Sequence, residues 1–413
     1  MKTLVPICCL LALFGAATIA PADTYHLDPV KGTADGDGSA GRPWKTLQDF
    51  VDAREVKGLK GGDTLKLYGG HHGAVKLAGE FEKTVVIEAA PGARATLSRL
   101  TVTSGKNWTI RGLVISPSLG KEAYTGSIVT LAEGGPGEST AIVLEDCFVF
   151  AATDTAAWGV KEWLGANSGI NSGRHGRGVV VRNNYVLNTR FGITLAGLDA
   201  VCEGNVISDF SADGIRTTRD GQIVRHNIIK NVYVSDADGD KNHDDGIQAF
   251  LFNKGTGEVK NVQVVGNIII NREDAKQKWP ATMQGIGFFD GPLVGFSVTD
   301  NVVLVDHWHG LSLYDAQGCT IARNTVQTMT PSKMKAWIML GTKQKLAKDN
   351  VVKENFAPTF NLKQPGTVSE VNKPVSEAIY GEALRKAYGV IVEKYGEKHG
   401  TAERVRLVVG AEK

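Results

Sequence analysis

The sequence is poor in several features that mark common protein classes. Its 413 residues include only 13 prolines, and 46 basic against 44 acidic side chains leave a formal charge of +2. A nucleic-acid-binding protein needs a larger basic surplus, so no nucleic-acid partner is expected. With 22% charged and 42% hydrophobic residues, the chain is neither disordered nor a polytopic membrane protein.

Cysteine is also scarce, and its five positions form no pattern. Cys8 and Cys9 lie in an apolar N-terminal run, whereas Cys147, Cys202 and Cys319 are far apart in the rest of the chain. Cysteines distributed so widely do not indicate a disulfide framework. The last three are interpreted as small buried hydrophobic side chains.

Long apolar runs are missing outside the N-terminus. There Lys2 precedes an apolar run over residues 4–17, and an A-x-A cleavage site follows at 20–22. The run is shorter than the ~20 residues that a membrane-spanning helix needs. The pattern predicts a cleavable signal peptide over residues 1–22 rather than a membrane anchor. The mature protein is therefore expected to be soluble and either secreted or periplasmic, with no membrane partner.

Glycine and two recurring phrases are what the sequence has in plenty. The 49 glycines are about 12% of the chain, against a usual ~7%. The first phrase is apolar-x-x-Asn followed by apolar residues, and its asparagines are spaced by 21, 22, 40, 34 and 23 residues. These asparagines are Asn184, Asn205, Asn227, Asn267, Asn301 and Asn324.

The second phrase is a Gly-Ile or Gly-Leu pair that precedes each asparagine by roughly a dozen residues or more. The pairs begin at Gly169, Gly192, Gly214, Gly246, Gly285 and Gly310. A repeat of about 22 residues with three short strands cannot bury an apolar face alone. Stacked at about 4.8 Å per coil, such repeats form parallel sheets around one core. An asparagine at a fixed corner would then hydrogen-bond to its counterparts above and below.

This pattern resembles the right-handed parallel β-helix of the pectate-lyase-like superfamily. The predicted fold is all-β, a single-stranded right-handed parallel β-helix solenoid with an N-terminal capping helix and a C-terminal helix. Apolar residues at helical spacing over 44–51 are expected to cap the first coil. A further helix is expected over about 376–395. The expected organisation is a signal peptide at 1–22, an N-terminal cap at 23–60, the β-helix at 61–356 and a C-terminal extension at 357–413.

The repeat also predicts a column of outward side chains. If the isoleucine or leucine of each second phrase points inward, the next residue points outward. The predicted column is Asn171, Thr194, Arg216, Gln248, Gly287 and Ser312. The variable loops that enter the same sheet carry polar side chains that would wall this column.

The column and its loops suit an anionic sugar polymer. β-Elimination at a uronate needs a neutralised carboxylate, a base for the C5 proton and an acid for the O4 leaving group. Arg216 is the candidate neutraliser or base, and Lys241 and His243 are candidate base and acid. Tyr314 is a candidate proton donor or substrate contact. The other candidate substrate contacts are Asn171, Arg174, His175, Arg190, Asn242, Gln248 and His309.

Each candidate also has a purely structural interpretation. An outward arginine is often only solvated, and His243 would serve equally well as a loop hydrogen-bonding residue. Asp244 and Asp245 are suited to capping the turn into the strand. Trp308, which stands between two histidines, fits either a sugar-stacking platform or a packed corner.

Metal binding has little support in the sequence. Asp236, Asp238 and Asp240 imitate the first half of an EF-hand loop, but the twelfth position is Ile247 rather than glutamate. No His/Cys group has zinc spacing. No cofactor is therefore required, and a calcium site of another construction stays open.

Residues 243–248 (HDDGIQ) and 213–216 (DGIR) resemble segments of β-helix polysaccharide lyases, above all alginate lyases and mannuronan C5-epimerases. The resemblance implies a lyase acting on a uronate polysaccharide, with alginate expected, and calcium bridges protein and sugar in several related lyases. The protein is expected to be a monomer. An epimerase would share the first proton abstraction, so the sequence does not separate the two.

Two further function classes remain open. A polygalacturonase-type hydrolase would pair Asp213 with the aspartates at 244 and 245, but Trp308 stands where that family has glycine before its histidine. A non-catalytic glycan-binding β-helix would be expected to show aromatic stripes, and the outward column contains few aromatic residues.

Overall fold

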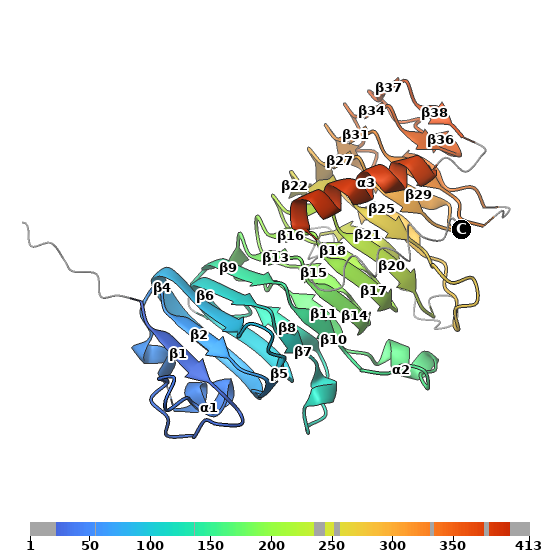
Figure 1. Ribbon diagram of the computed structural model, residues 1–413. Helices are drawn as coiled ribbons and strands as arrows, with labels where there is room; N and C mark the ends of the chain where they lie inside the picture. Colours follow the sequence, from blue (N-terminus) through green and yellow to red (C-terminus); the bar gives the residue numbers. More distant parts are fainter. Residues whose placement is uncertain are drawn as a thin grey trace, which may run out of the picture.

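The computed structural model describes residues 22–53, 55–135, 137–234, 244–251, 257–330, 334–375 and 380–396, and of Phe250 only the backbone. In these residues the chain coils into a parallel β-helix (Figure 1). All pairings between the strands are parallel, and the main sheets contain 23 and 12 strands. The predicted fold class is confirmed.

The larger sheet bends around two faces of the solenoid. The first face consists of β8 (Ser127–Leu131), β11 (Ser168–Asn171), β15 (Ile193–Leu195), β18 (Ile215–Thr217), β21 (Asp245–Phe250), β25 (Gln284–Asp290), β29 (His309–Tyr314), β33 (Trp337–Gly341) and β36 (Thr359–Asn361). The second face consists of β1 (Thr24–Leu27), β2 (Thr64–Leu67), β9 (Ser139–Glu145), β12 (Gly176–Arg177), β13 (Val180–Arg182), β16 (Val201–Glu203), β19 (Ile223–Arg225), β23 (Gln263–Val265), β27 (Ser297–Thr299), β31 (Thr320–Ala322), β34 (Val351–Lys353) and β37 (Val368–Glu370). The long strands β4 (Ala74–Ala89) and β6 (Arg99–Arg111) run across both faces.

The 12-stranded sheet forms the third face. Its strands are β3 (Gly70–His71), β5 (Ala95–Leu97), β7 (Val114–Ile115), β10 (Phe148–Phe150), β14 (Tyr185–Thr189), β17 (Val206–Phe210), β20 (Ile228–Val232), β24 (Ile268–Ile270), β28 (Val302–Leu304), β32 (Thr325–Gln327), β35 (Phe356–Ala357) and β38 (Lys373–Pro374). A small third sheet joins β22 (Val259–Lys260), β26 (Leu293–Val294) and β30 (Ala316–Gln317).

An asparagine ladder runs between the second and third faces, as predicted. In each rung the side-chain amide of one asparagine donates to the Oδ1 of the next coil's asparagine, for example from Asn205 to Asn227 and from Asn227 to Asn267, at 3.0 Å in both cases. The residue before each ladder asparagine has positive φ, which bends the chain sharply at this corner. The ladder continues past the predicted members to Asn355 and Asn372, and Cys147 N donates to Asn184 at its other end.

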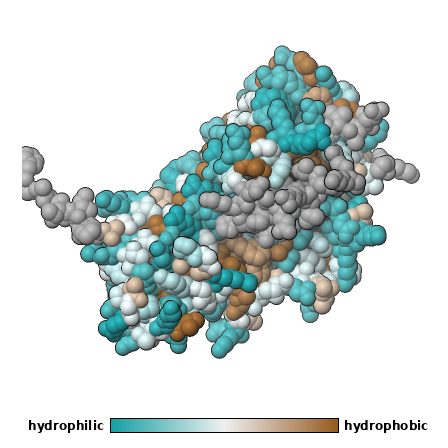
Figure 2. Space-filling model, viewed as in Figure 1, coloured by the Kyte–Doolittle hydropathy of each residue, from teal (hydrophilic) through white to brown (hydrophobic). Residues whose placement is uncertain are grey.

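The interior between the three faces is apolar. The inward residues of the second phrase, from Ile170 to Leu311, are at most 1% exposed. Cys147, Cys202 and Cys319 are free, buried thiols in the same core, so their interpretation as small hydrophobic side chains is confirmed. Figure 2 shows that hydrophilic residues cover most of the visible surface, with hydrophobic residues gathered near the middle of the solenoid.

The predicted helices are present at both ends of the chain. Helix α1 (Leu47–Asp52) begins after the side-chain cap of Thr46, and buries Leu47 and Phe50 against the first coils. Helix α3 (Tyr380–Tyr395) lies over the third face, where Leu384 and Ile391 pack on outward side chains of β17, β20, β24 and β28 (Figure 1). The remaining helical segments are η1 (Glu55–Gly58), η2 (Pro117–Leu119) and α2 (Val160–Leu164).

The solenoid extends beyond the limits of 61 and 356 predicted for it. At one end β1 pairs with β2, so the first coil already includes residues assigned to the cap. At the other end β36, β37 and β38 pair with the preceding coil, so the boundary at 356 was wrong. The proposed signal peptide lies outside the described residues, apart from its last residue. Among the described helices, none has the length and apolar character needed to cross a bilayer.

Candidate active site

The predicted outward column lies on the first face. Backbone register places Asn171 beside Thr194, Thr194 beside Arg216, and Arg216 beside Gln248. The column continues through Gly287 and Ser312. The four residues from Asn171 to Gln248 are partly exposed, whereas their isoleucine neighbours are buried. The direction predicted for these side chains is thus confirmed.

A second column runs beside the first, three residues earlier in each repeat. The Gly-Ile pair between the columns turns the two side chains toward each other. Arg216 Nε donates to Asp213 Oδ2 at 2.5 Å, and Gln248 Nε2 donates to Asp245 Oδ2 at 3.1 Å. Two coils further on, His309 Nδ1 and Ser312 Oγ are 2.8 Å apart. The second column consists of Ser168, Phe191, Asp213, Asp245, Gln284 and His309.

Arg216 is held firmly in the middle of this face. Its guanidinium is ion-paired with Asp213, which is fully buried, and lies 3.6 Å from the ring centroid of Phe191 in the preceding coil. The arginine side chain is 20% exposed. A carboxylate on one side and an aromatic face on the other fix the plane of the cation. Arg216 therefore presents an oriented positive charge at the surface.

Asp245 lies beneath this surface and is completely buried. Its backbone N–H donates to Asp213 Oδ1 at 3.1 Å. Burial, and then the charge of Asp213, raise the pKa of Asp245 well above its usual range. The next coil makes room for this carboxyl group by carrying glycine, because a Cβ at Gly287 would lie only 1.9 Å from Asp245 Oδ1.

The far end of the column is aromatic. The ring of Phe289 lies 4.9 Å from that of His309 and 5.4 Å from that of Tyr314, as centroid distances. Trp337 Nε1 donates to His309 Nδ1 and to Ser312 Oγ, at 3.2 Å each. Trp308, at 48% exposure, stacks on Trp337 with centroids 6.1 Å apart. The site is thus polarised along the solenoid axis, with a charged end and an aromatic end.

Tyr314, a candidate proton donor or substrate contact, lies well away from Arg216. It lies three coils further along the axis and two residues further along its strand, so the two Cα atoms are ~16 Å apart. Burial raises the pKa of Tyr314, and Lys343 Nζ is 5.5 Å from its ring centroid. Tyr314 belongs to the aromatic end instead.

Other predicted contacts lie at the margins of the face. Asn171 accepts a hydrogen bond from Gly173 N at 2.9 Å and closes the turn after β11. Arg174 and His175 are exposed in that turn. Arg190 donates from Nη1 to Leu164 O at 2.7 Å, so it anchors the loop that carries α2.

Three candidates lie outside the described residues, namely Lys241, Asn242 and His243. The acidic sequence from Asp236 to Asp240 also lies outside them. Among the described residues no group of three or more His, Cys, Asp or Glu side chains is arranged to hold a metal ion. A calcium site stays a prediction.

Sequence reasoning missed Phe191 and Trp337 as parts of the site. Phe191 stands directly before a Gly-Ile pair, in the position that Asp213 and Asp245 occupy in later coils. Aligning the residues on both sides of each pair would have placed it in the second column. Trp337 carries no such signal, because the phrase that begins β33 lacks the glycine.

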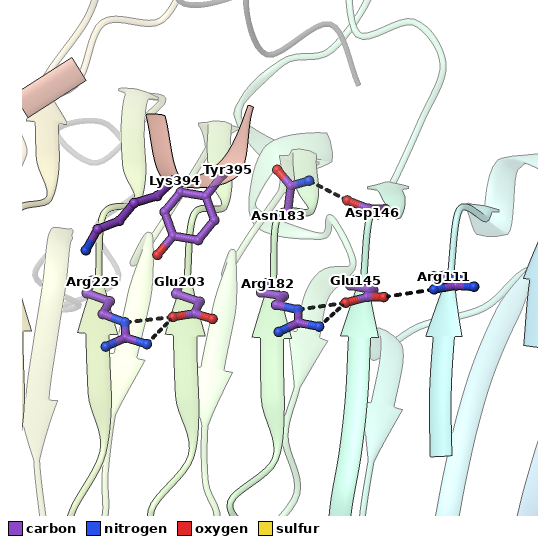
Figure 3. A pocket seen from close by; sticks show the side chains of 9 residues that line it. All are labelled: Arg111, Glu145, Asp146, Arg182, Asn183, Glu203, Arg225, Lys394 and Tyr395. Atoms are coloured by element: carbon purple, nitrogen blue, oxygen red, sulfur yellow. Dashed lines mark hydrogen bonds and ion pairs between the residues drawn. The ribbon is translucent and has the colours of Figure 1, made fainter. Parts of the chain in front are cut away.

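The second face carries a separate concavity of about 580 Å³ (Figure 3). Its charges alternate from coil to coil, and each arginine is paired, for example Arg182 with Glu145 and Arg225 with Glu203, at 2.6 Å in both cases. Lys394 and Tyr395 of α3 border it. These arginines are ion-paired, as Arg216 is with Asp213 on the first face, so pairing by itself does not distinguish the two surfaces.

Comparisons with known proteins support the architecture. No protein-family model matches the chain, and no curated protein matches it in sequence. A mannuronic-acid-specific polysaccharide family 6 lyase from human gut microbiota is similar in structure, with a TM-score of 0.56 and 14% identity over 95% of this chain and 100% of its own. The A-module of the Azotobacter vinelandii mannuronan C-5 epimerase AlgE6 has a TM-score of 0.50 and 14% identity, covering 85% and 100%.

A third similar structure, the Dettilon tailspike protein, has a TM-score of 0.51 and 14% identity over 84% of this chain and 68% of its own. At such low identity these likenesses concern the fold. The chain is a parallel β-helix protein with a polar and aromatic column on its first face.

Proposed function

We propose that this protein is a secreted polysaccharide lyase that cleaves an acidic, uronate-containing polysaccharide by β-elimination, with alginate as the expected polymer. The observation that carries the proposal is the oriented guanidinium of Arg216 on the first face, fixed by Asp213 and Phe191. Such a group matches the planar carboxylate of a uronate. The proposed substrate is an anionic polysaccharide, and the protein is proposed to act as a monomer without a required cofactor.

In the proposed reaction Arg216 acts as neutraliser rather than base, because a guanidinium stays protonated in proteins. Pairing with the uronate carboxylate acidifies the C5 proton and stabilises the carbanion that forms when it leaves. A base removes that proton, the C5 electron pair forms the C4–C5 double bond, and the C4–O4 bond breaks. O4 leaves with a proton from an acid. Lys241 and His243 remain the proposed base and acid.

Hydrolysis by paired carboxylates has less support. That mechanism requires two carboxyl groups that both reach the glycosidic bond. They lie either on opposite faces of the sugar ring or close together at the anomeric carbon. Asp213 and Asp245 are both fully buried. Both oxygens of Asp213 and the Oδ2 of Asp245 accept hydrogen bonds, from a backbone N–H, from Arg216 and from Gln248. These carboxyl groups position the side chains above them instead of facing the solvent.

The test is absorbance of the unsaturated uronate formed from polymannuronate, polyguluronate, polygalacturonate and glycosaminoglycans, with added calcium or with chelator. Wild-type protein should produce the chromophore, and Arg216→Ala should lower kcat/KM by ~10²–10³-fold, the scale of a lost oriented charge donor. Arg216→Lys should recover little, since lysine lacks the planar fork.

Arg323→Ala is the matched control. Arg323 is also ion-paired, through two 2.7 Å bonds to Asp300, but it lies at the corner that follows β31, away from the first face. If Arg216→Ala kept full activity, the proposed active site would be wrong, although the protein would still be a lyase. If no polymer gave the chromophore and new reducing ends appeared instead, the protein would be a hydrolase. If the uronate composition changed instead, it would be an epimerase.

A further inference from the structure

The aromatic end of the first face contains a surface that the elimination chemistry does not use. Trp308 and Trp337, here called the aromatic platform, stack with centroids 6.1 Å apart and ring planes inclined by 25°. Trp308 precedes β29, and Trp337 begins β33, so the platform spans two neighbouring coils. Its long direction therefore follows the solenoid axis.

The platform is both fixed and accessible. The indole N–H of Trp337 is shared between His309 Nδ1 and Ser312 Oγ, which sets the orientation of its ring. Trp308 is 48% exposed, and it is the one aromatic residue among the large exposed hydrophobic side chains of the described part of the chain. A tryptophan so exposed leaves apolar area in water that a ligand would cover.

The platform lies further along the solenoid axis than Arg216. The coil of Arg216 is separated by three steps from that of Trp308 and by four from that of Trp337. At ~4.8 Å per step, the coils that carry the two ends of the site lie ~14 to ~19 Å apart along the solenoid axis. A pyranose unit is about as long as one step, so an extended chain of about four or five sugars would reach from one end to the other.

We propose that the aromatic platform is a distal sugar-binding subsite, on which the apolar face of a pyranose ring of the polysaccharide stacks while a uronate of the same chain lies at Arg216. This inference rests on the proposed function and adds to it a minimum length of substrate. Aromatic faces bind the C–H face of a sugar, whereas a cation binds its carboxylate, so the two ends recognise different features of one polymer. The protein then acts on internal stretches of polymer in preference to short oligomers.

The test uses Trp308→Ala, with Trp308→Phe to retain an aromatic face. Affinity for polymannuronate, polyguluronate and polygalacturonate is measured by isothermal titration, and kcat/KM is measured on size-fractionated oligouronates. We expect Trp308→Ala to bind polymer about tenfold more weakly, and Trp308→Phe to recover most of the loss. On oligouronates too short to span the site, Trp308→Ala should match wild type. Val30→Ala, which removes a side chain that is 83% exposed in the N-terminal cap, is the control.

The outcomes separate this inference from the proposed function. Weaker polymer binding by Trp308→Ala supports the subsite even in a protein that forms no unsaturated uronate. Equal binding by wild type and Trp308→Ala overturns the subsite and leaves the lyase intact. An equal loss on short and long substrates also overturns it, because the platform would then act at the reaction centre. Absence of binding to all three polymers by wild type overturns it as well.

Discussion

Replacing Asn227 by alanine removes one rung from the middle of the asparagine ladder. Its Oδ1 accepts from both the backbone N and the side-chain Nδ2 of Asn205, at 2.9 and 3.0 Å. Its own Nδ2 donates to Cys202 O at 3.0 Å. Asn227 is fully buried, so no water replaces these partners in the variant. The Asn205 N–H and the Cys202 carbonyl would each lose this bond.

The magnitude follows from these lost partners. A buried polar group left without a partner costs ~1–3 kcal/mol, so two backbone groups together cost ~2–6 kcal/mol. Asn227→Ala should therefore lower the free energy of unfolding by about 4 kcal/mol. Asn372 makes equivalent bonds, to Val352 O at 2.8 Å and from Asn355 at 2.9 and 3.1 Å, but it is partly exposed at the end of the ladder. Water can replace its bonds, so Asn372→Ala should cost only ~1 kcal/mol.

Urea unfolding followed by far-ultraviolet circular dichroism and tryptophan fluorescence measures both variants. The comparison holds residue type constant and contrasts a fully buried rung with the last, partly exposed one, which also lacks the bond that Asn227 donates to Asn267 Oδ1 at 3.0 Å. An Asn227→Ala protein that is no less stable than Asn372→Ala would refute the view that the buried ladder stabilises the solenoid through its satisfied amides.

Three further predictions concern single groups. Burial and nearby positive charges lower the pKa of His226 to about 4, so the unfolded chain binds a proton first as pH falls. The free energy of unfolding should therefore drop by up to about 3 kcal/mol between pH ~6.5 and ~4. His226→Asn, which suits the positive φ at this position, should flatten that decline in urea titrations. Gly287→Ala should lower stability by ~1–3 kcal/mol in thermal unfolding, since its Cβ would meet Asp245 Oδ1 at 1.9 Å, whereas Gly134→Ala, with no atom within 4 Å, should not. Three buried thiols should stay unlabelled by a thiol reagent, read by mass spectrometry, until the protein unfolds, because burial raises their pKa values. They are Cys147, Cys202 and Cys319.

Much of the fold was predictable because a solenoid repeats its local structure. Residues at one position of each repeat must lie in one column, which is why the ladder and the outward column were placed correctly from spacing alone. The C-terminal limit failed for a specific reason. Three prolines between 357 and 375 indicated irregular structure, but short strands of two or three residues lie there. Pro374 is at the end of the outermost strand, where no further coil needs a backbone N–H donor, so the N–H that proline lacks is not missed.

The candidate site was predictable in its columns but not in its contacts. The repeat places Arg216 on the surface, yet its contact with Phe191 depends on how side chains lean between coils. Arg190 was expected to contact substrate, but it bonds to Leu164 O in an inserted loop whose path no period determines. The repeat places Tyr314 on the outward side of its strand, but its contact with Phe289 again depends on how side chains lean between coils.

The rigid spacing of the coils makes the two ends of the site energetically separable. Arg216 and Trp308 lie on coils ~14 Å apart, and the backbone pairing of β21 and β25 between them fixes that distance. Groups more than ~7–10 Å apart without shared partners contribute additively, within ~0.5 kcal/mol. The double variant Arg216→Lys with Trp308→Ala should therefore lose kcat/KM on polymer by the product of the two single losses. A double variant no worse than Arg216→Lys alone would mean that the tryptophan acts only through the arginine, and the polymer would then not be held at two independent points.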